Sequence, residues 1–199
     1  MVLEFDSDGL ERRLKRLDGS HRALFACAVA ERCITACASG IDTSGHPIDV
    51  TLLRDGLDAA WRAVEGKIRE EALESLIVEV EDFAPDEASG EEWGESSASL
   101  QDAAIAISLA LRCATSSKLS DAVESATAGY DAADYAANQR LDVDFNSDQA
   151  EVDLLASTEV QAELGAQLAD LEMLETSQGQ RVPIADTLET MRSGLSKPH

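Results

Sequence analysis

Positive charge and proline are both scarce in this chain of 199 residues. The first shortage argues against certain partners, and the second favours helices. Lysine and arginine number 16 against 39 aspartates and glutamates, so the formal charge is −23. Such a chain repels nucleic-acid phosphates and anionic lipids, which argues against both as direct partners. Only 4 prolines occur, and 31 alanines and 23 leucines outnumber the 19 valines and isoleucines. This composition favours helices over strands.

Signals for secretion or membrane insertion are also missing. The first nine residues are acidic and lack the basic and apolar stretches of a secretory signal. The most apolar windows, 23–38 and 103–114, are too short or too interrupted for a spanning helix, which needs about 20 residues. All four cysteines fall in Ala-rich helical runs, so we expect reduced thiols in a core. We therefore predict a cytoplasmic protein.

The familiar catalytic and ligand-binding motifs are absent as well. The three histidines, His21, His46 and His199, have no metal-ligand spacing, and neither H-E-x-x-H nor Cys-x-x-Cys occurs. The phosphate loops G-x-x-x-x-G-K-[ST] and G-x-G-x-x-G are missing, as is the G-x-S-x-G elbow. We accordingly expect no cofactor and no metal site.

Apolar spacing and end signals predict eight helical segments. The segments are Ser7–Leu17, Ser20–Ser39, Asp49–Glu65, Ile68–Phe83, Ser97 or Ser99 to Leu111, Ser120–Leu141, a long one after Asn146–Asp148 to Thr176 with a break near Ser157, and Pro183–Met191. Ser20, Asp49 and Ser120 are the expected N-caps, and Gly40 is expected to end the second helix before a loop at Ile41–Pro47. The prediction is an all-α, single-domain helical bundle of about seven or eight helices without a significant sheet. An acidic Gly/Ser loop is expected at 84–96 and a frayed tail at 196–199.

The negative charge is distributed unevenly. Residues 1–70 hold 10 basic and 12 acidic residues, whereas residues 71–199 hold 6 and 27. No basic residue lies between Arg69 and Arg112. Such asymmetry points to partners rather than to the fold.

The first functional hypothesis is therefore a non-enzymatic interaction module that binds a basic protein through this acidic region. One concrete form is an immunity- or antitoxin-like inhibitor that covers the positive cleft of a nucleic-acid-binding protein. The candidate partner-binding residues are Glu79, Glu81, Glu91, Glu92, Trp93 and Glu95. The alternatives are that the charge only keeps the protein soluble, and that Trp93 covers the bundle instead of anchoring an interface.

A second hypothesis is a small-molecule enzyme. Asp131 and Asp134 are three residues apart on one predicted helix, with Tyr130 and Tyr135 beside them, and general acid–base chemistry would need one carboxyl pKa raised by burial or by its neighbour. A solvated helix face with packed tyrosines is the alternative. A third hypothesis is a regulatory homo-oligomer, such as a homodimer, joined through the Ala-rich helices of the first half.

Arginines on otherwise apolar helices are expected to neutralise nearby acids. Arg32, Arg54 and Arg62 are of this kind, and Glu31 and Asp58 are the acids expected to meet them. Asp58 and Arg62 have the i,i+4 spacing of a helical ion pair.

Several stretches occur together in an order that resembles one bacterial family. They are Leu10–Leu17 (LERRLKRL), His21–Arg32, Leu53–Trp61 (LRDGLDAAW), Asp102–Leu111 (DAAIAISLAL), Ser120–Val123 (SDAV) and Leu168–Glu175. Together they resemble the YjaG-like proteins, an all-helical domain-of-unknown-function family. The resemblance implies a compact, single-domain, cytoplasmic helical protein, and it implies no catalytic residue.

Overall fold

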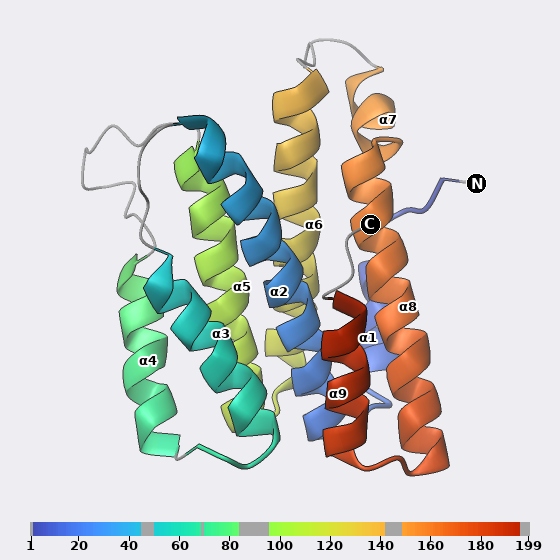
Figure 1. Ribbon diagram of the computed structural model, residues 1–199. Helices are drawn as coiled ribbons and strands as arrows, with labels where there is room; N and C mark the ends of the chain where they lie inside the picture. The colour runs from blue at the N-terminus through green and yellow to red at the C-terminus, as the bar shows by residue number, and fades with distance from the viewer. Residues whose placement is uncertain (1, 45–49, 69, 84–95, 142–148, 196–199) are drawn as a thin grey trace.

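The computed structural model describes residues 2–44, 50–68, 70–83, 96–141 and 149–195, which form one helical domain (Figure 1). These residues contain nine α-helices and no β-strand. The helices are α1 (Ser7–Leu14), α2 (Gly19–Ser44), α3 (Thr51–Val64), α4 (Glu70–Phe83), α5 (Ser96–Ser116), α6 (Leu119–Leu141), α7 (Ala150–Leu155), α8 (Thr158–Gln180) and α9 (Ile184–Leu195). The predicted all-α, single-domain bundle is confirmed.

The centre of the bundle is the long helix α2, which packs against α5 more extensively than any other pair of helices. Helix α5 also contacts α3, α4 and α6, while α2 reaches α8 and α9 (Figure 1). Phe25, Ile34, Trp61 and Ile107 are among the largest side chains that are fully buried there. The alanines of α2 from Ala23 to Ala30 are buried in the same core. These alanines are therefore not on the surface of the chain.

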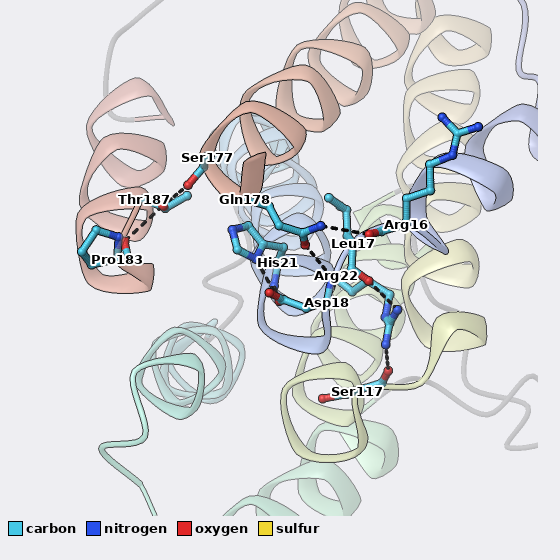
Figure 2. A network of polar contacts seen from close by, with 10 residues as sticks. All are labelled: Arg16, Leu17, Asp18, His21, Arg22, Ser117, Ser177, Gln178, Pro183 and Thr187. Carbon is cyan, nitrogen blue, oxygen red and sulfur yellow. Dashed lines mark hydrogen bonds and ion pairs between the residues drawn. The ribbon is translucent and has the colours of Figure 1, made fainter. Parts of the chain in front are cut away.

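The start of α2 depends on Asp18 and not on Ser20, so the expected N-cap is wrong. The Asp18 carboxylate accepts hydrogen bonds from the backbone N–H of His21 at 3.0 Å and from its ring Nδ1 at 2.8 Å (Figure 2). Burial raises the pKa of Asp18, but these hydrogen bonds outweigh it, and the net pKa is below the usual value. Arg22 donates to the carbonyl of Ser117 at 2.9 Å, which joins this end of α2 to the turn between α5 and α6.

Other predicted helix ends also differ from the structure. Helix α2 continues to Ser44, so Gly40 does not end it and Ile41–Ser44 are not in a loop. Helix α6 begins at Leu119, which places Ser120 inside its first turn. The expected cap Asp49 lies outside the described residues. The break near Ser157 is confirmed, since the Ser157 hydroxyl accepts from the Val160 N–H at 3.3 Å and begins α8.

The four cysteines are free and buried, as predicted. Burial raises the pKa of Cys37 to about 11 and that of Cys113 to about 12. Thiols with such pKa values are protonated near neutral pH and react slowly. All four pack in the core.

Candidate functional site

A groove of about 480 Å³ follows the surface between α5 and α6 and reaches α4. Because only two residues separate α5 from α6, the two helices run antiparallel side by side, with α4 against the other side of α5 (Figure 1). Four carboxylates line the groove, whereas Arg112 is the one cationic side chain among its lining residues in the described structure. The acids are Glu81, Asp102, Glu124 and Asp131. The groove therefore carries a net negative charge.

The charges are arranged in two groups along the groove. Near the turn between the helices, Arg112 forms an ion pair with Glu81 of α4, and Glu124 of α6 lies in the same part of the lining. Farther from the turn, Asp102 of α5 and Asp131 of α6 are close enough to interact electrostatically. Because α5 rises about 1.5 Å per residue, the Cα atoms of Asp102 and Arg112 are about 15 Å apart.

The Asp102–Asp131 pair is the most perturbed part of the groove. Burial, together with the negative charge of Asp131, raises the pKa of Asp102 to about 6. Partial burial and the neighbouring Asp134 raise the pKa of Asp131 as well. Both raised pKa values mean that the surroundings disfavour the charged form of the carboxyl group. A cation placed between the two would offset the part of this effect at Asp102 that comes from the charge of Asp131.

Between the two charged groups the groove is apolar apart from two hydroxyl groups. Ile105 is 39% exposed, although it is a large hydrophobic residue, and Ala104 and Ala128 lie beside it in the lining. Ser108 also lines the groove and is only 6% exposed. Its hydroxyl has no hydrogen-bond partner within the part of the chain that the structure describes. Thr127, by contrast, donates to the carbonyl of Val123 at 3.3 Å.

Only part of the predicted Tyr–Asp site lies in the groove. Asp131 lines the groove, but the ring of Tyr130 stacks on Phe5 with ring centroids 4.9 Å apart. Tyr130 packs against a small second core built from residues such as Ala137 and Val160. Partial burial raises the pKa of Asp134, which does not line the groove. The ring of Tyr130 is therefore outside the groove lining, although burial and the nearby Asp134 and Asp131 raise the pKa of its hydroxyl.

The predicted partner-binding acids are only partly within the described structure. Glu79 is exposed on α4 and accepts from the Ser75 hydroxyl at 3.1 Å. Glu81 lies in the groove, paired with Arg112. The remaining candidates, Glu91, Glu92, Trp93 and Glu95, lie outside the described residues, as does the loop expected at 84–96 except for Ser96.

Of the arginines expected to meet acids, Arg54 pairs with Glu31 at 3.1 Å, as predicted. Glu31 also accepts from the indole N–H of the buried Trp61 at 3.2 Å. Asp58 pairs with Arg192 of α9 at 3.1 Å, which places it in a contact between helices instead of the expected i,i+4 pair within α3.

Arg32 meets two acids of α8 that the sequence does not connect to it. Its guanidinium donates to Glu163 at 2.7 and 3.1 Å and to Asp170 at 2.7 Å. Burial lowers the pKa of Arg32, but the two carboxylates outweigh it and the net pKa is raised.

Asp102 and Ser108 are groove residues that the sequence did not connect with Asp131. Both belong to an Ala- and Leu-rich run whose composition indicates only core packing. The available signal was their position on one face of α5 together with Ile105 and Arg112, at intervals of three to four residues. Three of the four residues on that face are polar or charged, although most of the surrounding helix is apolar.

In the described ranges no helix is long and apolar enough to cross a membrane. Nor is any set of three or more His, Cys, Asp or Glu side chains in those ranges arranged to hold a metal ion.

The fold and the groove define a single-domain, all-helical protein with an acid-lined surface groove. The chain belongs to the family described as "Protein of unknown function (DUF416)", whose model matches residues 9–195. It is also similar to the crystal structure of a DUF416 family protein from Shewanella baltica OS155. That similarity has a TM-score of 0.74 and 20% identity, over 93% of this chain and 92% of the other. At this identity the similarity shows a shared fold. No curated protein matches the chain.

Proposed function

We propose that this protein is a non-enzymatic interaction module that binds a basic protein partner through the acidic face formed by α4, α5 and α6. The observation that carries the proposal is the groove, where four carboxylates face one guanidinium that is already paired with Glu81. Exposed acids of α4, such as Glu79 and Asp82, extend the negative surface beside it. A field of one sign attracts an oppositely charged partner and speeds its association.

The concrete form that we propose is an immunity- or antitoxin-like inhibitor that occupies the positive cleft of a nucleic-acid-binding protein. A cleft that binds phosphates presents lysines and arginines, and an acidic helical face is electrostatically complementary to it. The four free cysteines support a reducing, cytoplasmic setting, and the sequence resemblance to the YjaG-like proteins supports the same setting.

The test has two stages. The tagged protein is first used at low salt to capture a basic partner from the native lysate, which is eluted by increasing salt and identified. Association of the purified pair is then measured for wild type and for Glu79→Lys/Asp82→Lys. The matched control is Glu172→Lys/Asp186→Lys, which reverses two exposed acids on α8 and α9.

Reversal on α4 is expected to slow association at least tenfold at low salt and to flatten its salt dependence, because steering by a charged face typically changes on-rates 10- to 1,000-fold. The control should change the rate much less. Equal rates for the two variants would contradict the proposed face, and the absence of a salt-sensitive basic partner would contradict the function.

One observation favours a second candidate, an acid–base enzyme. Asp102 has a pKa of about 6 and lies beside Asp131 in an open groove, which is an arrangement suited to proton transfer near neutral pH. Loss of turnover of a metabolite in both Asp102→Asn and Asp131→Asn, with the fold retained, would support the enzyme over the interaction module.

A further inference from the structure

We propose that the groove between α5 and α6 binds a linear aliphatic polyamine, with one ammonium group between Asp102 and Asp131 and a second near Glu124 and Ser108. This proposal goes beyond the proposed function and does not depend on it. It assigns a small-molecule ligand to the groove, whereas the proposed function concerns a protein partner on the wider acidic face.

The first support is the spacing of charged and apolar groups. A polyamine has ammonium groups separated by short methylene chains, and the groove has two anionic positions separated by Ile105, Ala104 and Ala128. The 39% exposure of Ile105 leaves apolar surface where the methylene chain would lie. A groove of about 480 Å³ also has the size of a small-molecule site.

The second support is Ser108. The residue is 6% exposed, it lines the groove, and within the described residues its hydroxyl forms no hydrogen bond. Because the hydroxyl is open to the groove, its oxygen can accept a hydrogen bond from a donor bound at this level. This observation is independent of the acidic residues.

The geometry of the acids favours an ammonium group over a guanidinium group. Asp102 and Asp131 project from two different helices. An ammonium has three donors that can be shared among acceptors from several directions, whereas a guanidinium fork matches a single carboxylate in one plane. Besides burial, the negative charge of Asp131 raises the pKa of Asp102, and a cation bound between the two carboxylates would offset this repulsion.

Spermidine is the probe, and the readout is a titration followed through the backbone amide signals of the full chain at pH 7.5 and moderate salt. We expect saturable shifts confined to the groove segments of α5 and α6. Asp102→Asn and Asp131→Asn should each raise the Kd about tenfold or more, because hydrogen bonds to charged groups contribute on that order.

Two further variants separate a built site from general attraction of cations to an acidic protein. Ile105→Ser keeps the charge and removes the apolar contact, so it should raise the Kd several-fold. Asp186→Asn removes an equal charge from the exposed acidic surface of α9 and should leave the Kd unchanged. If Asp186→Asn weakens binding as much as Asp131→Asn, or if Ile105→Ser has no effect, the proposal is wrong.

Two competing ligands complete the test. Mg²⁺ at the same concentration should not reproduce the shifts, and trilysine should bind more weakly than spermidine and be insensitive to Ile105→Ser. Equal shifts with Mg²⁺ would reassign the groove to metal cations, and tighter binding of trilysine would reassign it to a basic peptide. Either result overturns the polyamine proposal without affecting the charge-reversal test on α4, so the two proposals fail separately.

Discussion

Gly129 is the residue at which the close packing of α6 against α2 and α8 is most constrained. A Cβ atom at this position would lie 2.6 Å from Cγ1 of Val29, 2.7 Å from Oε1 of Glu163 and 3.3 Å from Nε2 of Gln167. Val29 is fully buried in the core, and the glutamate and glutamine belong to the polar network that holds α8. All three neighbours are buried, so a shift of any of them would disturb other contacts.

We therefore expect Gly129→Ala to lower the free energy of unfolding by about 1–3 kcal/mol, the usual cost of overpacking, even though alanine favours helices. Gly165→Ala on α8 is the matched control, because a Cβ there meets nothing within 4 Å. It should raise stability by about 0.5–1 kcal/mol. Urea unfolding measures both changes, and stabilisation by Gly129→Ala would contradict the packing described.

Asp102 gives a prediction about pH, because its pKa rises from 3.8 to about 6 in the folded protein. A carboxyl with a raised pKa holds its proton more tightly when folded, so its contribution to stability is lost as pH rises from about 4 to about 6. Burial is the main cause of this shift and the negative charge of Asp131 adds to it, while Asp102 in turn acts on the thiols of Cys33 and Cys37 of α2. The thiols stay neutral in this range because burial raises their pKa values.

Asp102→Asn should therefore stabilise the protein by about 1–2 kcal/mol above pH 6, with little gain at pH 4, since one pKa unit corresponds to about 1.4 kcal/mol and partial exposure reduces the effect. Unfolding curves from pH 4 to pH 8 measure the difference. Asp131→Asn should move the step to lower pH by removing the neighbouring charge. A gain that does not change with pH would show that Asp102 is not held at a raised pKa.

At the scale of helices, Arg32 connects α2 to α8 through Glu163 and Asp170. The side chains of the three residues are 19%, 8% and 15% exposed, so the network is nearly dry. Gln167 extends it by donating to Glu163 and to the carbonyl of Ala126 of α6, both at 2.9 Å. Three helices thus meet at one set of polar contacts.

Removing Arg32 would leave two carboxylates in this region without a counter-charge. We expect Arg32→Ala to lower the free energy of unfolding by about 3–5 kcal/mol, the usual cost of breaking a buried pair. Arg13→Ala, which removes the more exposed pair with Glu175 between α1 and α8, should cost about 1 kcal/mol or less. Denaturant unfolding of the two variants makes the comparison, and equal costs would contradict a special role for Arg32.

The helices themselves could be predicted because their apolar spacing is a local property of the sequence. All eight predicted segments contain helix in the structure, and the long seventh one divides at Ser157 as the pattern indicated. The helix ends were less predictable. Ser20 and Asp18 are both good capping residues, and the choice depended on His21, whose backbone and ring nitrogens both reach Asp18.

The groove could be predicted only in part. Asp131 was a candidate because it has acidic and aromatic neighbours in the sequence, but its partner Asp102 is 29 positions away in a run that resembles core. Only the packing of α5 on α6 brings the two together. The network of Arg32 was missed for the same reason, since Glu163 and Asp170 belong to a helix more than 130 residues farther along the chain.

For the whole molecule, the dominant property is a formal charge of −23 on a chain of 199 residues. The ion pairs found in the described residues engage only part of the acids, and among the other acids whose exposure the structure describes, most are exposed. Folding brings these like charges closer together than they are in the unfolded chain. Repulsion between these charges therefore destabilises the folded state relative to the unfolded chain.

Added salt should accordingly raise the Tm, because at about 0.15 M the Debye length falls to about 8 Å and repulsion between exposed acids is screened. Thermal unfolding in 10 mM and 300 mM sodium chloride measures the effect, with chloride chosen because sulfate stabilises proteins by other means. A variant with Glu74, Glu151, Glu172 and Glu189 replaced by glutamine removes four exposed charges and should show a smaller rise. Salt also screens the attractive ion pairs. If salt lowers the Tm instead, those ion pairs stabilise the folded protein more than repulsion between the exposed acids destabilises it, and the prediction is wrong.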